Sequence, residues 1–339
     1  MMKELEKLCL LDGISGDEGQ VRDYIISRIK GKCEYHIDPL GSIIAFKKGR
    51  KTPDKKLLIS AHMDEVGFIV NYITEDGFLK ITPVGGIDPR VVFGRRVRVG
   101  EEKLIGVIGA KALHHLDGDE RSKAPDFPEM YLDIGAADKA QAQEHIMLGD
   151  SAVFVSDFVR FGKGMVGCKA IDDRAGCAIM LDLIDSELEY DTYFTFVVQE
   201  EIGLRGSTAA AYTVDPDIAI VLEATTAADI PSASGEKKVC CVGKGPVVSF
   251  MDRSTIYDKG LYRLAFDTAE KLGIPCQTKT MVAGGNDAGA IHKSRGGVRA
   301  CGISLPCRYL HSPSCVISES DFENTVKLVK AMLPKVYEV

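Results

Sequence analysis

Two adjacent glutamates, Glu200 and Glu201, directly follow an apolar stretch in the sequence VVQEEIG. Carboxylates placed in this way can bind a metal ion or take a proton from water. Neighbouring side chains at the end of a strand point to opposite sides, so one glutamate can ligate a cation while the other acts as a general base. The cation would also offset the repulsion between the two charges. On its own, an acidic pair is more typical of a solvated surface.

Four more stretches place metal-type ligands close to the ends of predicted strands. These stretches are LLISAHMDE with His62 and Asp64, CKAIDDR with Asp172 and Asp173, AIVLE with Glu223, and LPCRYLHSPS with His311. In parallel α/β sheets, ligands bind outside the carboxyl ends of the strands, so we expect these side chains to converge. A mixed set of imidazoles and carboxylates suits zinc, cobalt or manganese.

The elements that must position these residues alternate between apolar strands and amphipathic helices, which predicts an α/β fold with a mixed, largely parallel sheet flanked by helices. We expect strands at 42–46, 56–61, 192–198, 217–223 and 297–306, and helices within 15–31, 173–186, 254–273 and 318–333. Ser15 or Asp17 is the expected cap of the helix within 15–31.

The stretch 67–165 differs, because it consists of short β-like runs separated by Gly, Pro and charged turns. We interpret it as a small all-β domain inserted into a catalytic α/β domain made of residues 1–66 and 166–339. The insertion separates His62 from Asp172 in the sequence. Its two ends must therefore lie close together if those two residues meet at one site.

Composition excludes several classes of protein. The formal net charge of -7 argues against a basic surface for nucleic acid or anionic membranes. The amino-terminal sequence lacks the layout of a signal peptide, and we expect a cytoplasmic protein.

The ten cysteines of the chain show no CxxC pair and indicate free thiols. A zinc knuckle from Cys301, Cys307, His311 and Cys315 stays open as an alternative, although its spacing fits no common zinc motif.

Six motifs in one order resemble those of the M42 family of metallo-aminopeptidases, which includes glutamyl and tetrahedral aminopeptidases. The motifs are HMDEVGF, AIDDRAG, VVQEEIGLRGS, VLEATTAADIP, AGGNDAGAIH and YLHSPSC. The resemblance extends over essentially the whole chain. It implies an enzyme that removes N-terminal amino acids from peptides.

The resemblance also implies two divalent metal ions per subunit, with zinc preferred over cobalt or manganese. His62 and Glu223 would hold the first ion, Glu201 and His311 the second, and Asp172 would bridge both. Members of the family commonly have Asp where this chain has Glu223, so the geometry of the first site is expected to differ.

Two further roles follow from the resemblance. Glu200 would be the general base that takes a proton from a metal-activated water, and Asp64 would orient the imidazole of His62. The inserted domain would mediate self-association, as dimers that build a dodecamer. Two other readings remain: an endoglucanase-type glycoside hydrolase with two acting carboxylates, and a catalytically silent metal-binding assembly protein.

Overall fold

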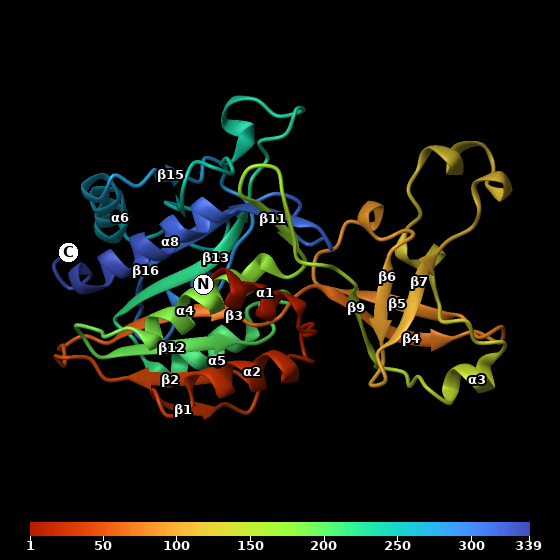
Figure 1. Cartoon of the computed structure of the whole chain (residues 1–339), viewed down its shortest axis with the longest axis horizontal. Helices are drawn as coiled ribbons and strands as arrows, with labels where there is room; N and C mark the ends of the chain where they lie inside the picture. Colours follow the sequence, from red (N-terminus) through yellow and green to blue (C-terminus); the bar gives the residue numbers. More distant parts are fainter.

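The computed structural model describes residues 1–339, with the backbone alone described at 119, 120 and 236. Figure 1 shows two parts along the long axis, a large sheet with helices and a smaller group of strands beyond β9. The large sheet has eight strands, in the order β1 (Glu34–Ile37), β2 (Ile43–Lys47), β12 (Thr192–Val197), β3 (Leu57–His62), β13 (Ile218–Thr226), β16 (Arg299–Cys307), β14 (Val247–Val248) and β15 (Gln277–Thr278).

The sheet is mixed, as the sequence predicts. Its four central strands, β12, β3, β13 and β16, run parallel, whereas β1, β2 and β14 join through antiparallel pairs. Parallel strands are covered on both faces, and the apolar residues of β3 and β13 accordingly alternate between two cores. Ile59 and Ile220 belong to one core, and Leu58 and Val221 to the other.

Helices cover both faces of this sheet (Figure 1). The larger core is formed with α1 (Met2–Leu10), α2 (Gly19–Ile29), α4 (Ile171–Asp185), α6 (Lys259–Leu272) and α8 (Glu319–Met332). The other face packs against α5 (Arg205–Val214) and α7 (Ala288–Ile291). Two short 3-10 turns, η5 (Gly235–Lys238) and η6 (Leu333–Lys335), lie in connections of this part.

Between β3 and α4 the chain forms a closed six-stranded barrel of antiparallel pairs. The barrel order is β4 (Gly67–Ile73), β5 (Leu79–Val84), β8 (Tyr131–Asp133), β7 (Leu104–Gly109), β6 (Arg96–Val99) and β9 (Ser151–Phe154). Its other elements are α3 (Lys139–Gln143), η1 (Pro89–Val91), η2 (Leu113–His115), η3 (Gly118–Ser122) and η4 (Phe127–Glu129). The barrel has its own core around Phe68 and Phe154. The exact domain limits at 66/67 and 165/166 stay a prediction.

A small antiparallel sheet of β10 (Val159–Phe161), β11 (Met165–Cys168) and β17 (Cys315–Ser318) follows the barrel. In this sheet Cys168 of β11 lies directly opposite Cys315 of β17 in the strand register. The segment that leads to Asp172 therefore lies beside the segment that follows His311, although the two are far apart in sequence.

The helix that begins near residue 19 is not capped as the sequence predicts. Its N-cap residue is Glu18, and no side chain caps it. The Ser15 hydroxyl donates instead to Asp64, and Asp17 accepts from Ser151 of the barrel. Both expected caps are thus used for long-range contacts that a local pattern cannot reveal.

Two other expectations concern the whole chain. All ten cysteines are free thiols, as the sequence predicts. Among the described residues, no helix has the length and apolar character that crossing a bilayer requires.

Candidate metal centre

The predicted ligands meet at one edge of the large sheet. His62 is the last residue of β3 and is in register with Val197, the last residue of β12, three positions before Glu200. Glu223 lies two residues beyond the Val221–Ser60 pair of β13 and β3, which brings it level with His62. The carboxyl ends of parallel strands thus bring three of the ligand-bearing segments together.

The first group of ligands surrounds the imidazole of His62, which is 1% exposed. Its Nε2 atom lies 3.3 Å from Asp172 Oδ1 and 3.2 Å from Glu223 Oε1. The other oxygen of Glu223, Oε2, is buried without a hydrogen-bond partner. Two carboxylates therefore face one ring nitrogen inside the protein.

The second group surrounds His311, which lies between β16 and β17. Its Nε2 atom is 3.6 Å from Asp172 Oδ2 and 3.3 Å from Glu201 Oε2. The two oxygens of Asp172 thus face different imidazoles, Oδ1 toward His62 and Oδ2 toward His311. Asp172 links the two groups.

The main chain fixes the tautomer of both imidazoles. His62 Nδ1 lies 3.0 Å from the carbonyl oxygen of Asp64, and His311 Nδ1 lies 2.7 Å from that of Gly86. A carbonyl only accepts, so each Nδ1 is the donor and each Nε2 can present a lone pair to the carboxylates. Lone pairs on nitrogen and oxygen repel one another unless a proton or a metal cation lies between them, so this arrangement fits a metal that replaces the proton on Nε2.

The side chain of Asp64 lies beside His62 and also contacts the turn that carries the two glutamates. Its Oδ1 lies 3.4 Å from His62 Nδ1, farther than its own carbonyl oxygen does. The two carboxylate oxygens of Asp64 also accept the main-chain N–H groups of Glu200 and Glu201, at 3.0 and 3.1 Å. Asp64 therefore holds the turn with the two glutamates as well as the histidine.

A buried ion-pair network supports the site from behind. Lys169 and Arg174, each at most 1% exposed, both donate to the carboxylate of Glu65. Arg174 also donates to main-chain oxygens, including that of Met63 at 2.7 Å. The bonds of Arg174 therefore fix the segment between His62 and the barrel.

Burial and charge shift the pKa values of the ligands. Burial raises the pKa of Glu201 to about 7 and raises that of Glu223 well above its usual range. Burial lowers the pKa of His311, but the contact with Asp172 and the charge of Glu201 outweigh it and bring the pKa to about 10. Burial opposes ionisation of Asp172 as well, yet His311 and His62 hold its pKa well below the usual range.

Metal binding is expected to release protons and to strengthen as the pH rises. Coordination needs a neutral imidazole and an ionised carboxylate. With pKa values of about 10 and about 7, His311 is protonated and Glu201 is about half protonated near pH 7. Calorimetric titration with zinc in buffers of different ionisation enthalpy measures this release. Affinity should rise about tenfold per pH unit for each proton released. Affinity that is independent of pH would argue against these residues as the ligands.

The structure brings a further acidic residue to the ligands. Asp173, a metal-type residue of the CKAIDDR stretch that is not in the predicted ligand set, forms a metal-capable group with His62 and Glu223, and its Oδ2 has no hydrogen-bond partner. Asp287 is also fully buried, with both oxygens unpartnered, and burial raises its pKa to about 6. Within the described residues, the metal-capable groups include no cysteine, so the zinc knuckle gains no support.

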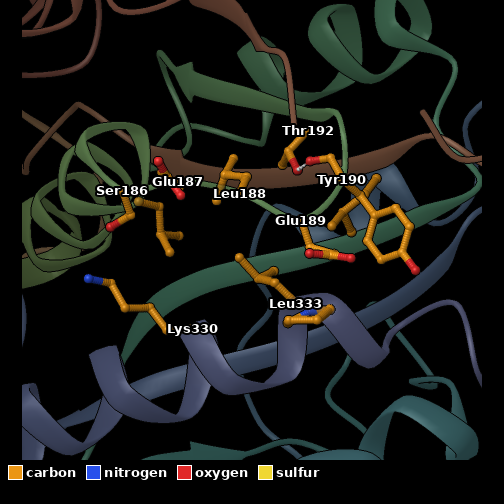
Figure 2. A pocket seen from close by; sticks show the side chains of 11 residues that line it. Ser186, Glu187, Leu188, Glu189, Tyr190, Thr192, Lys330 and Leu333 are labelled. Atoms are coloured by element: carbon orange, nitrogen blue, oxygen red, sulfur yellow. Dashed lines mark hydrogen bonds between the residues drawn. The ribbon is translucent and has the colours of Figure 1, made fainter. Parts of the chain in front are cut away.

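Figure 2 shows a different pocket, of about 120 Å³, between the loop after α4 and the end of α8. Leu57 and Thr192, the first residues of β3 and β12, help to line it. The pocket therefore lies at the amino ends of these strands, whereas His62 lies at the carboxyl end of β3. Glu187, Glu189 and Lys330 are its charged lining residues, and none of the predicted ligands reaches it.

Known proteins are similar to this chain in sequence and in fold. A family model described as M42 glutamyl aminopeptidase matches residues 41–328. The chain belongs to the M42 family. It is accordingly a peptidase, a hydrolase that acts on peptide bonds.

Individual M42 relatives are similar over nearly the full length. A putative aminopeptidase of Acetivibrio thermocellus is 39% identical over 333 residues, which cover 97% of both chains. A TET aminopeptidase from a marine sediment archaeon of the Thaumarchaeota has a TM-score of 0.94 and 34% identity, covering 99% of this chain and 96% of that one. The Pyrococcus horikoshii TET1 peptidase, which can assemble into a tetrahedron or a large octahedral shell, has a TM-score of 0.86 and 35% identity, covering 98% of both chains.

Proposed function

We propose that this M42 peptidase is a two-metal aminopeptidase that removes amino acids from the N-terminus of peptides. The observation that supports the proposal most strongly is the position of Asp172 between two imidazoles whose Nε2 atoms both face carboxylates. This donor set of nitrogen and oxygen suits zinc, cobalt or manganese. His62, Asp172 and Glu223 would hold one ion, and Asp172, Glu201 and His311 the other.

Two divalent ions in this position would supply Lewis acidity for the scissile carbonyl and lower the pKa of a water. The protein residues then have separate tasks. Glu200 accepts the proton of the attacking water and returns it to the departing amine. Its carboxylate is half-buried, and burial raises its pKa well above the usual value, which suits a group that must both take and give a proton.

The chemistry of the surroundings favours a cationic substrate group. Asp173 and Asp287 are both buried near the metal ligands, and burial raises the pKa of each. With a pKa of about 6, Asp287 is the one that is mostly ionised at neutral pH. A free α-ammonium group carries the opposite charge, and attraction to the Asp287 carboxylate would orient the peptide with its N-terminus inward. We assign the exopeptidase specificity to this acidic surplus.

The function is tested by removing and restoring the metal. The protein is treated with a chelator and reloaded with zinc, cobalt or manganese in turn, and aminoacyl chromogenic amides are assayed beside a soluble cellulose derivative. We expect chelation to abolish amide cleavage and one or more of the three ions to restore it. Cellulose cleavage that chelation leaves unchanged would favour the glycosidase, and the absence of both activities would favour a silent metal-binding protein.

The barrel is the surface that we propose for self-association into a dimer-based dodecamer. It exposes several large apolar side chains, namely Tyr72, Phe93, Ile105, Val107 and Leu113. Contiguous exposed apolar surface marks a protein interface, and we propose that these side chains contribute to one. Light scattering in solution tests the proposal, and a particle with the mass of a single 36.8 kDa chain would contradict it.

A further inference from the structure

The turn that bears Glu200 and Glu201 needs outside support. It begins with Gln199, whose φ of 57° lies in the left-handed region that residues other than glycine rarely adopt. Three successive main-chain N–H groups, from Gln199 to Glu201, point away from β12 and its ladder. Their acceptors determine where the proposed base and the proposed ligand lie.

Two buried carboxylates from separate segments accept all three N–H groups. Asp64 accepts from Glu200 and Glu201, as described above. The N–H of Gln199 donates to Glu18 Oε1 over 3.1 Å. The same Glu18 oxygen accepts the N–H of Gly16 at 2.8 Å, and Ser15 donates to Asp64 at 2.6 Å.

Glu18 is held rigidly enough for this task. It is 5% exposed and is the N-cap residue of α2. Val21, Ile25 and Ile29 of that helix are fully buried in the main core. The position of Glu18 is therefore set by the packing of α2 rather than by the turn that it contacts.

We propose that Glu18 is a positioning residue for the hydrolysis, acting through the main chain of Gln199 on Glu200 and Glu201. The inference depends on the proposed function, because it assumes that Glu200 is the base. A misplacement of about 1 Å in a catalytic group can cost about 10²-fold in rate. Glu18 must place an acceptor oxygen within hydrogen-bond distance of the Gln199 N–H, and its negative charge is not required.

Three variants at position 18 distinguish the effect of side-chain length from the effect of charge. Glu18→Ala removes the acceptor and should lower kcat about 10- to 100-fold, with KM within about twofold of the unchanged protein and two metals still bound. Glu18→Gln keeps an oxygen at the same reach and should retain kcat within about threefold. Glu18→Asp keeps the charge but shortens the reach, and should resemble Ala. Asp17→Ala, which alters the exposed neighbour, is the matched control and should change little.

Several results would overturn the inference. One is full turnover in both Glu18→Ala and Glu18→Asp, and another is an equal loss in Glu18→Gln. If Glu18→Ala does not fold, the Gln and Asp variants decide alone. Glu200→Gln in the same assay separates this inference from the proposed function. If Glu200→Gln stays active, the proposed function fails. If it is inactive while Glu18→Ala and Glu18→Asp are both fully active, only the role of Glu18 fails.

Discussion

The Glu200→Gln variant is expected to bind both metals and to lose about 10²- to 10⁴-fold in kcat, the usual contribution of general acid–base catalysis. Gln has nearly the same shape as Glu but cannot accept the proton of the attacking water. The main-chain N–H of Glu200 remains bonded to Asp64, so the turn should keep its conformation. Steady-state kinetics with an aminoacyl amide, together with metal analysis of the same sample, measures both effects.

The matched control for this variant is Glu187→Gln. Glu187 lies in the loop of Figure 2 and pairs with Arg50 at the exposed surface, away from the ligands. Its replacement should leave kcat unchanged. A Glu200→Gln enzyme with normal turnover, or one that has lost its metals, would be incompatible with a base that is not itself a ligand.

The Asp172→Asn variant is expected to lose at least one of the two metals and about 10³-fold or more in kcat/KM. The amide has a single oxygen, whereas the structure uses one carboxylate oxygen toward His62 and the other toward His311. Lewis-acid stabilisation amounts to several kcal/mol, and each 1.36 kcal/mol corresponds to about tenfold in rate. Elemental analysis of the dialysed variant gives the number of metals per chain.

Asp182→Asn provides the control on the same helix. Asp182 belongs to α4 like Asp172, but its carboxylate pairs with Lys330 of α8. The control should keep both metals and full activity. If Asp172→Asn also keeps two metals and normal turnover, Asp172 does not link the two groups of ligands.

Much of the site follows from local sequence patterns. His62 and Glu223 belong to apolar strands, and Glu201 follows another, so the rule that parallel strands present ligands at their carboxyl ends places all three at one edge. The mixed sheet and its helices follow from the same periodicities. The strand-end rule does not place Asp172, because the strand before it, β11, lies in a different, smaller sheet, and Asp172 is predicted from its motif.

The supporting contacts could not be predicted, because they join segments far apart in sequence. The carbonyl of Gly86 orients His311 from the barrel side, 225 positions away. Ser15 and Glu18 precede α2 in a pattern typical of a helix cap, yet both contact the machinery at Asp64 and Gln199. A main-chain acceptor or an atypical cap leaves no signature in a single sequence, since its partner is set by the packing of the whole sheet.

The central claim is that five side chains hold two cations, and anomalous diffraction from zinc-loaded crystals tests it most directly. The account predicts two anomalous peaks per chain, one among His62, Asp172 and Glu223, and one among Asp172, Glu201 and His311. A single peak, or peaks that Asp172 does not contact, would contradict the account.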